Sequence, residues 1–431
     1  MNKRRVAITG VGVVSPLGHN YEETWANLLA GHSGIAPISH FDASAFPTYI
    51  AAEVKNFSPS KDIATAKHNR FAMPFTHYAL EAASQAFQDA RIKPEKNNAK
   101  RFGVVVGSGM MTAEFSFLHR FQQTCAVSGK PNWQELQAKA KSFYRLTDFG
   151  KTTSNSGLSL LIQQFGIEGY ASSVHTACAS GGQALGLAMQ VIRRGEADVM
   201  LAGGFDSMIN PLGVSSFCLL GALSPYNEEP ATASRPFDGT RNGFVLGEGA
   251  AFLILEEWTK AKARGATIYA ELAGEGNSLS SYRITDSHPN GDGAIQAIER
   301  AIKDGGVNPC DVDYINAHGT STKMNDLSET NAIKAVFKER AYQLPVSSTK
   351  SQTGHLIAAA GALEAAISTL AIKHNTIPKT ANLKTKDPEC DLDYVVDGPR
   401  KKSLGAVLSN SFGFGGSNSC LLFKHPEFEG K

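Results

Sequence analysis

Two stretches of the sequence, one in each half of the chain, share the same order of strand, turn and small-residue helix. In the first, a short strand ends at His175-Thr-Ala-Cys178, and a helix is predicted over Ala179–Ile192. In the second, Val346–Lys350 leads through a turn at His355 into a helix over Ala358–Ile372. Small residues dominate both helices, so the two can pack closely at a buried centre. The repeat predicts a duplicated α/β unit.

Apolar runs mark the strands of this unit. They predict strands at Val6–Val14 and Ala197–Gly203 and, as an apolar pair at the end of each half, at Gly243–Glu256 and Gly405–Phe423. The polar and aromatic stretch Phe115–Gly150 is expected to be an excursion from the core. A charged, helix-like stretch at Glu257–Ala266 marks the expected junction between an N-terminal half, 1–257, and a C-terminal half, 258–431.

Composition narrows the classes of function. The 431 residues exceed what one compact core usually holds, and a net charge of +2 does not point to nucleic acid or to a membrane surface. The best candidate for a membrane span, Leu356–Ile372, is interrupted by Glu364. The six cysteines are scattered without a CxxC pair, which argues against disulfides and structural zinc and favours a reducing cytoplasm.

Cys178 is the candidate nucleophile. It stands in Thr-Ala-Cys-Ala-Ser-Gly-Gly, where small neighbours suit a tight turn and the start of a helix favours the thiolate. On this pattern alone, a buried and unreactive cysteine stays open as the alternative. His175, three residues earlier, has no second pair of ligands nearby, so no metal site is expected.

Two histidines follow predicted strands at glycine-flanked turns, where catalytic groups of α/β proteins concentrate. His318 lies in Tyr-Ile-Asn-Ala-His-Gly-Thr, and His355 lies in Gln-Thr-Gly-His-Leu. Either histidine taken alone is more often structural. Their shared context makes both of them candidate site residues.

Four charged residues stand near these turns. Lys350 and Glu364 are candidates for a buried ion pair, and Asp326 and Glu329 are candidates for orienting the turn after His318. The alternative for all four is a solvated helix face.

The segment Asn410–Asn418 is a glycine-rich loop before the last strand. No Lys-Ser or Lys-Thr follows it, as it would in a phosphate-binding P-loop. Its aromatic residues are better placed to wall an apolar tunnel, and a simple β-hairpin is the alternative.

Taken together, these segments resemble the β-ketoacyl-acyl-carrier-protein synthases of the thiolase superfamily, from Val6 to about Phe423. The matching motifs are ITGVGVVSPLG, TACASG, SRPFD with GFVLGEGA, NAHGTST, SSTKSQTGHLIAAAGALEA and NSFGFGG. They look more like the type II elongating enzymes than type I. The resemblance implies an α/β protein with a thiolase-like five-layered α-β-α-β-α fold from two duplicated halves, and a homodimer.

The resemblance also assigns roles to site residues. Cys178 becomes the acyl acceptor, and His318 and His355 complete a Cys-His-His triad. The other assignments are Lys350 as the active-site lysine paired with Glu364, Thr320 and Thr322 as partners of the pantetheine arm, Phe412 as a substrate-binding residue, Phe414 as a gate, and Asp326 and Glu329 as structural charges near the site. No metal and no organic cofactor are implied, because the pantetheine belongs to the carrier.

The implied reaction is a decarboxylating Claisen condensation of an acyl thioester with malonyl-acyl-carrier protein, in fatty-acid chain elongation. The implied partner is acyl carrier protein. A ketosynthase of a type II polyketide or polyene pathway shares every catalytic motif and stays open as the alternative. Cys178 argues against a non-catalytic partner subunit, and Cys420, which is followed by leucines instead of standing in Cys-x-Gly, argues against a thiolase.

The departures from the family pattern concern carrier docking. Phe71 and Gly221 stand where the family often has basic residues, and Lys323 stands at a usual proline. Lys67 and Arg70 are the remaining basic candidates. We therefore expect a thinner basic patch, and the identity of the carrier stays open.

Overall fold

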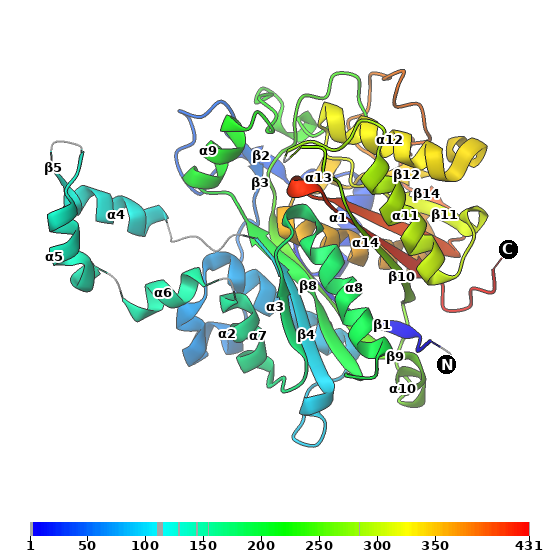
Figure 1. The fold of residues 1–431 in the computed structure, drawn as a ribbon, viewed down its shortest axis with the longest axis horizontal. Coiled ribbons are helices and arrows are strands. Elements are labelled where there is room, and N and C mark those ends of the chain that lie inside the picture. Colours follow the sequence, from blue (N-terminus) through cyan, green and yellow to red (C-terminus); the bar gives the residue numbers. More distant parts are fainter. Residues whose placement is uncertain are drawn as a thin grey trace.

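The computed structural model describes residues 3–109, 115–127, 130–143, 145–153, 155–283 and 285–430. Its centre is a ten-stranded sheet that is covered by helices (Figure 1). The strands of this sheet are β1 (Val6–Val14), β4 (Phe102–Ser108), β7 (Ala171–Val174), β8 (Val199–Ser207), β9 (Glu248–Glu257), β10 (Ala270–Leu279), β11 (Val312–Asn316), β12 (Val346–Ser347), β15 (Ala406–Phe412) and β16 (Ser417–Lys424). Their order is β12-β11-β15-β16-β10-β1-β9-β8-β4-β7.

The sheet consists of two halves with the same topology. From the junction outward, one half has the order β1-β9-β8-β4-β7 and the other has β10-β16-β15-β11-β12. Each half thus places its first strand beside its fifth, followed by its fourth, second and third. β1 and β10 join the halves as an antiparallel pair, with Ala7 opposite Glu271 and Ile8 opposite Ala270. The predicted duplication is confirmed by this repeated strand order.

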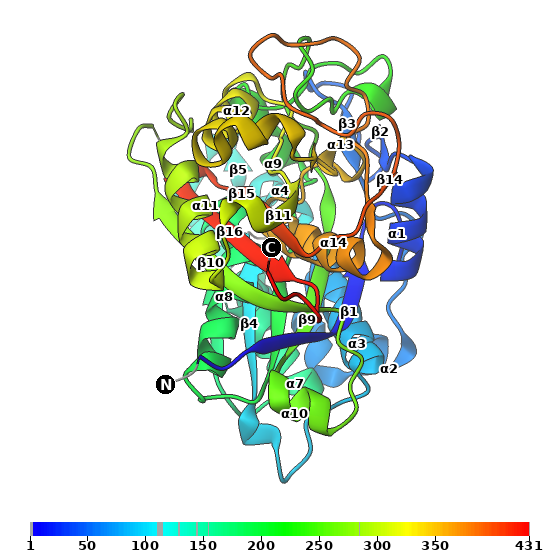
Figure 2. The same cartoon turned by 90° about the vertical axis from the view of Figure 1, so that its right-hand side faces the viewer.

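Helices divide the arrangement into five layers. The helices concerned are α3 (Pro74–Ala90), α7 (Ser156–Phe165), α8 (Ser180–Arg193), α11 (Asp292–Gly305), α12 (Lys323–Phe337) and α14 (Ala360–His374). α8 packs on β4 and β8 and against α14, which packs on β15 and β9, so these two helices form the central layer. α3 and α7 cover the outer face of one half-sheet, and α11, flanked by α12, covers that of the other. Figure 2 shows α11 and α14 on opposite sides of β16. The expected α-β-α-β-α order is confirmed.

Each central helix starts from the same kind of turn. A tight helical turn over Ala177–Ala179 precedes α8, and another over Ile357–Ala359 precedes α14. The first residue of each turn is left-handed, with φ of 50° at Ala177 and 47° at Ile357. Such a backbone is unfavourable for residues other than glycine, so its presence in both turns marks them as equivalent positions of the duplicated unit.

Glycines let α8 and α14 touch at the centre, as their small-residue sequences predict. A Cβ atom on Gly181 would lie 2.7 Å from the backbone N of Ala362, and one on Gly361 would lie 2.8 Å from that of Gly182. All residues of α14 from Ala360 to Ile372 are buried, which explains why small and apolar residues predominate on all sides of this helix. Within the part of the chain that the structure describes, no helix is long and apolar enough to cross a membrane.

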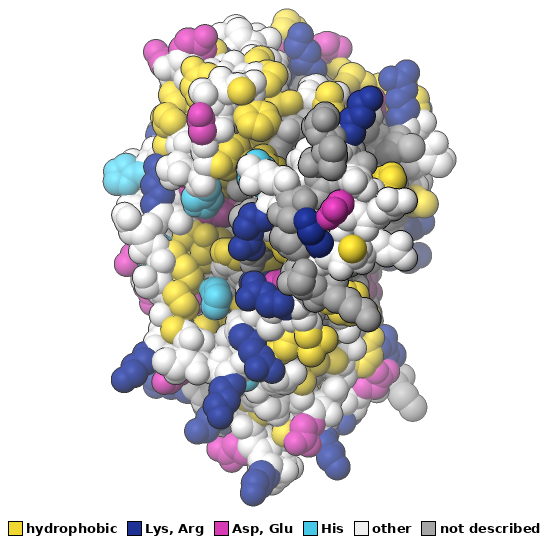
Figure 3. Space-filling view, turned by 90° about the vertical axis from the view of Figure 1, so that its left-hand side faces the viewer, with side chains coloured by type: hydrophobic (Ala, Val, Ile, Leu, Met, Phe, Trp, Pro, Cys, Tyr) yellow, Lys and Arg dark blue, Asp and Glu magenta, His cyan; other side chains and the backbone are white. Residues whose placement is uncertain are grey.

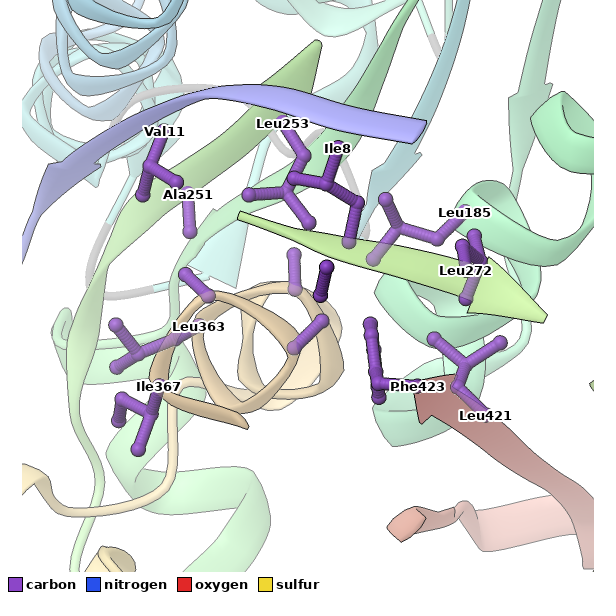
Figure 4. Close-up of a cluster of buried hydrophobic side chains, with 14 of the residues drawn as sticks. Ile8, Val11, Leu185, Ala251, Leu253, Leu272, Leu363, Ile367, Leu421 and Phe423 are labelled. Atoms are coloured by element: carbon purple, nitrogen blue, oxygen red, sulfur yellow. The ribbon is translucent and has the colours of Figure 1, made fainter. Parts of the chain in front are cut away.

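The largest core lies where the two halves meet the central helices (Figure 4). In Figure 4, Leu363 and Ile367 of α14 lie on the side of the helix nearest Ala251 of β9, and Leu421 and Phe423 of β16 lie on its other side. Truncating a leucine in such a core to alanine costs about 2–5 kcal/mol. This core therefore fixes the two halves as one unit.

The remaining helices are α1 (Tyr21–Ala30), α2 (Lys61–Thr65), α4 (Phe115–Cys125), α5 (Trp133–Phe143), α6 (Leu146–Thr152), α9 (Pro211–Leu219), α10 (Trp258–Ala263) and α13 (Lys350–Thr353). Two-stranded sheets are formed by β2 (Ile35–Pro37) with β3 (Ile50–Ala52), β5 (Ala126–Val127) with β6 (Lys130–Pro131), and β13 (Thr376–Ile377) with β14 (Arg400–Lys401). α4, α5 and α6 stand away from the layers at the left of Figure 1, as expected for an excursion.

One strand prediction is wrong. Gly243–Glu256 holds one strand, β9, which pairs with β1 on one side and with β8 on the other. Gly243 and Gly247 bring the backbone too close to Leu223 and Thr353 for any side chain to fit, so the described residues between them run outside the ladder. This segment has a different use, because Val245 accepts a hydrogen bond from the N–H of His355, with 2.8 Å between O and N.

Candidate active site

Cys178 lies in the turn that starts α8, and its side chain is 2% exposed. The hydroxyl of Ser180 fixes this turn, since it donates to the carbonyl of Ala177 at 2.7 Å and accepts from the N–H of Thr176 at 2.8 Å. The turn directs the thiol away from its own helix and toward the second half of the chain, where both histidines lie.

His355 contacts the sulfur directly. Its Nε2 lies 3.1 Å from Cys178 Sγ, and its Nδ1 accepts from the N–H of Ile357 at 3.2 Å. Because Nδ1 is the acceptor, the ring proton of the neutral imidazole is on Nε2, which faces the sulfur. Burial, together with the charge of Lys350, lowers the pKa of His355 well below its ordinary value. His355 is therefore a neutral donor at neutral pH.

His318 completes a cluster with these two residues. The sulfur and one ring nitrogen of each histidine lie within 4.8 Å of one another, and the two imidazole rings are 5.3 Å apart and nearly perpendicular. Burial and the charge of Lys350 lower the pKa of His318 well below its ordinary value. Thiolate and imidazole also bind Zn²⁺, and this is the group of described residues that comes close enough to hold an ion.

Glu329 on α12 holds the backbone at His318. Its Oε1 accepts from the N–H of His318 at 2.9 Å, and its Oε2 accepts from the N–H of Gly319 at 2.8 Å. Asn410 donates to the same Oε1, at 2.9 Å. Burial raises the pKa of Glu329, while these donors lower it. The expectation that this carboxylate orients the turn after His318 agrees with these contacts.

Burial dominates the chemistry of the thiol. It raises the pKa of Cys178 to about 12, although the Phe414 N–H, the Lys350 charge and the Cys178 N–H act in the opposite direction. The start of the helix favours the thiolate, as expected, but desolvation outweighs this contribution. The two N–H groups that face the sulfur also face any oxyanion formed beside it.

The charged residues singled out in the sequence are all buried. Lys350 on α13 forms an ion pair with Glu364 on α14, and both are 2% exposed, which excludes a solvated helix face. Burial raises the pKa of Glu364 to about 7 against the opposing effect of Lys350. Asp326 accepts from the N–H of Phe237 at 2.8 Å, and Arg241 lies 3.6 Å from the same oxygen.

A cavity of about 500 Å³ leads from the surface to this cluster. Its lining includes Cys178, His318, His355, Thr320, Thr322, Phe412 and Phe414 at the walls and floor, and Leu220, Gly221, Asp286, Lys323 and Met324 toward the outside. The hydroxyls of Thr320 and Thr322 lie 3.0 Å apart on one wall. The Phe412 ring contacts that of His318, with 5.8 Å between centroids. The cavity thus brings every site residue predicted to touch substrate onto one surface.

The glycine-rich loop joins antiparallel β15 and β16, so it is a hairpin and a cavity wall at once. Gly415 and Gly416 have φ of 80° and 82°, which favours glycine at both positions. A Cβ atom on Gly416 would lie 1.9 Å from the carbonyl oxygen of Ser280. The ring of Phe414 packs on that of Phe217, with 6.2 Å between centroids.

Sequence reasoning missed Asp206. This carboxylate at the end of β8 is 1% exposed and accepts from the N–H of Ala358 at 3.0 Å. Burial raises its pKa to about 7. An acidic residue that ends an apolar strand, as in Leu201-Ala-Gly-Gly-Phe-Asp206, was the available signal. Lys67 and Arg70, the basic docking candidates, lie in a short helical turn and do not line the described cavity.

The chain matches two family descriptions in sequence. "Beta-ketoacyl synthase, N-terminal domain" matches residues 3–261, and "Beta-ketoacyl synthase, C-terminal domain" matches residues 269–384. A 3-oxoacyl-[acyl-carrier-protein] synthase 2 of Coxiella burnetii is 44% identical over 422 residues, which cover 98% of this chain and 99% of the relative. The protein of the same name from Synechocystis is 40% identical over 426 residues, with 98% and 99% covered.

Solved structures show the same fold. A type II polyketide ketosynthase, described in complex with its acyl-carrier protein, is 35% identical, has a TM-score of 0.87, and is matched over 98% of this chain and 100% of that one. A β-ketoacyl synthase from Burkholderia phymatum is 33% identical, has a TM-score of 0.88, and is matched over 98% and 99%. These full-length matches, together with the Cys-His-His cluster in its cavity, show that the chain belongs to the β-ketoacyl synthase family.

Proposed function

We propose that the protein condenses an acyl thioester with malonyl-acyl-carrier protein, with loss of carbon dioxide, and gives a β-ketoacyl-acyl-carrier protein in fatty-acid chain elongation. The contact between Cys178 Sγ and His355 Nε2, 3.1 Å at the floor of a cavity, is the observation that carries this proposal. The curated relatives at 44% and 40% identity are named 3-oxoacyl-acyl-carrier-protein synthases, which supports the same activity.

In the first half-reaction, Cys178 takes the acyl group from its carrier. The sulfur attacks the thioester carbonyl, a new carbon–sulfur bond forms, and the bond to the carrier sulfur breaks. The proton lost by Cys178 ends on the departing carrier thiol. The N–H groups of Cys178 and Phe414, which face the sulfur, stabilise the tetrahedral oxyanion.

In the second half-reaction, both histidines donate to the thioester oxygen of the malonyl group. Decarboxylation leaves an enolate there, and neutral donors stabilise it without themselves losing a proton. The lowered pKa values of His318 and His355 support this role. The enolate carbon then attacks the acyl carbonyl on Cys178, the new carbon–carbon bond forms, and the sulfur leaves and regains a proton.

The charged residues act through these histidines. Burial keeps both imidazoles neutral, and the charge of Lys350, which is held by Glu364, adds to this effect. Glu329 fixes the backbone that carries His318. Asp326 supports the same turn, because it accepts a hydrogen bond from the N–H of Phe237 and lies beside the guanidinium of Arg241. Thr320 and Thr322 lie on the wall along which the pantetheine arm enters.

The proposal extends to the assembly. We propose a nucleophile-bearing half over 1–257 and a histidine-bearing half over 258–431, acyl carrier protein as partner, and a homodimer. β7, the edge strand of the ten-stranded sheet, is only partly buried and offers a free edge to a second copy. The free cysteines at Cys178, Cys218, Cys310, Cys390 and Cys420 suit a cytoplasmic enzyme.

A type II polyketide or polyene ketosynthase is the second candidate. The likeness to a polyketide ketosynthase at 35% identity favours it, but the fatty-acid relatives are more similar, at 40–44%. The deciding experiment incubates the purified protein with malonyl-acyl-carrier protein and acyl-carrier proteins of graded chain length. Formation of β-ketoacyl products two carbons longer supports the proposal. Failure to extend any saturated acyl chain, with extension of a polyketide starter instead, would replace it with the second candidate.

A further inference from the structure

Two exposed apolar side chains, Leu220 and Met324, stand at the mouth of the active-site cavity, and a third, Leu219, is the chain neighbour of Leu220. Leu219 is 90% exposed and Leu220 is 51% exposed, at the end of α9. Met324, in the first turn of α12, is 37% exposed. Leu220 and Met324 also line the cavity. Two helices that are distant in sequence therefore present apolar groups to solvent at the same opening.

The charge at this mouth is small. Among the described residues that line the cavity, Lys323 is the cation and Asp286 the anion. Gly221, which follows the leucines, has no side chain, and a Cβ atom there would meet nothing within 4 Å. Figure 3 shows the face on the side of α9, with apolar side chains gathered at the upper left and Lys and Arg side chains both at the upper right and in a row through the middle of the face.

The cavity itself indicates what covers these side chains. It runs without interruption from Leu220, Lys323 and Met324 to Cys178. A thioester that is tethered to a carrier reaches Cys178 only when the body of the carrier lies over this mouth. Single exposed apolar residues are normal on a protein surface, but Leu220 and Met324 at this opening, with Leu219 next to Leu220 in the chain, form a contact surface.

We propose that Leu219, Leu220 and Met324 form an apolar docking surface that selects a carrier protein with an apolar contact face beside its prosthetic arm. This inference rests on the proposed function. Docking of this kind depends little on salt, because apolar contacts are not screened, whereas contacts between rim charges mainly accelerate association and weaken as salt rises. An apolar contact mainly slows dissociation of the complex, so its loss raises KM for the carrier-bound substrate.

The test compares Leu219→Ser and Leu219→Lys with the unaltered enzyme. Leu219 does not line the described cavity, so its replacement probes docking without altering the reaction site. Val396→Ser, at a side chain that is 53% exposed and also outside the cavity lining, is the matched control. Each protein is assayed with decanoyl-acyl-carrier protein and with decanoyl-pantetheine, both with malonyl-pantetheine as the second substrate, at low and high salt.

Apolar docking predicts that both Leu219 variants raise KM for the carrier-bound substrate about five- to tenfold, at either salt concentration, as expected for loss of an anchoring side chain. Activity on decanoyl-pantetheine and the control variant should stay unchanged. If Leu219→Lys instead lowers KM at low salt, docking is electrostatic and the inference is overturned, as it is if neither variant changes KM. If the unaltered enzyme condenses neither substrate, the proposed function itself is overturned. The assay with decanoyl-pantetheine separates this outcome from a failure of docking, because that substrate has no carrier protein.

Discussion

The carboxylate of Asp206 accepts a hydrogen bond from the backbone N–H of Ala358, with 3.0 Å between Oδ2 and N. Asp206 ends β8, in the half of the chain that carries Cys178, whereas Ala358 belongs to the turn after His355. The bond thus ties the nucleophile and its nearest histidine across the junction of the two halves. The Asp206 charge also raises the pKa of Cys178.

Replacing Asp206 by asparagine should change how stability depends on pH. Burial raises the pKa of Asp206 from 3.8 to about 7, so between these pH values the folded state holds a proton that the unfolded state has lost. The stability that this group contributes is therefore highest at acid pH and falls as pH rises to 7. Relative to the unaltered protein, Asp206→Asn should gain up to about 4 kcal/mol in free energy of unfolding between acid and alkaline pH. Urea unfolding at both pH values measures this, and an equal difference at both would contradict it.

Cys178→Ala should abolish condensation and covalent acylation. The enzyme is incubated with labelled acyl-carrier protein and then examined by mass spectrometry. Cys218→Ala is the matched control, because Cys218 is only partly buried, packs against the same apolar cluster and is not among the described residues that line the cavity. Label that persists in the Cys178 variant, or that appears on another cysteine of the unaltered enzyme, would exclude the assigned nucleophile.

His318→Ala and His355→Ala should each lose about 10²–10³-fold in decarboxylation of malonyl-carrier protein, as expected for loss of one oxyanion donor, while acylation of Cys178 is largely kept. Both imidazoles have a pKa well below 6.5, so carbon dioxide release by the unaltered enzyme should stay level as pH falls through 6.5 and decline only below it. A decline centred on pH 6.5, or release near the normal rate in either variant, would speak against the neutral-donor role.

Lys350→Met should destabilise the protein by about 3–5 kcal/mol, because Glu364 would remain buried without its partner. The double variant Lys350→Met/Glu364→Leu should recover most of this loss. Since the Lys350 charge lowers the pKa of both histidines, the acid limb of decarboxylation should also move to higher pH in both variants. An unmoved acid limb would mean that Lys350 has a structural role only.

Gly416→Ala and Gly415→Ala form a matched pair in the loop that carries Phe414. Both positions have positive φ, so both variants strain the backbone, but only the Gly416 substitution meets the Ser280 carbonyl, at 1.9 Å. Gly416→Ala should therefore displace the loop and lower kcat by about 10²-fold, whereas Gly415→Ala should have a much smaller effect. Similar kcat values for the two variants would show that the position of this loop is not critical.

Crystal structures with free and acylated Cys178 would show whether Phe414 moves as a gate.

Patterns of neighbouring residues in the sequence were sufficient to predict the central helices and the turns that carry the two histidines. Small residues identified both central helices, and glycine-flanked turns identified His318 and His355, because each of these features depends on neighbours in sequence. Asp206 was missed because an acid at a strand end has the same local pattern whether it is solvated or buried. The sequence likewise shows only part of what sets the pKa of Cys178, since the helix start is visible in the sequence and desolvation is not.

The spacing of residues in the sequence does not determine which distant segments come into contact. Lys350 and Glu364 were candidates for a buried pair, but their spacing left a solvated helix face open, and only the fold decides between the two. Gly243–Gly247 was assigned to a strand because it is apolar, although its glycines let it pass beside His355 instead. The apolar side chains at the mouth come from α9 and α12, which share no sequence pattern.

The two equivalent turns before the central helices differ in what they have kept. Each has a histidine two residues before its left-handed position, His175 in one and His355 in the other. Where the first turn has Cys178, the second has Ala358, whose side chain is a methyl group and whose N–H is bound by Asp206. His175 is correspondingly turned aside, with its Nδ1 3.0 Å from the Ser108 carbonyl. Each copy of the turn thus supplies one reactive group, Cys178 from the first and His355 from the second, so the site exists only where the two halves meet.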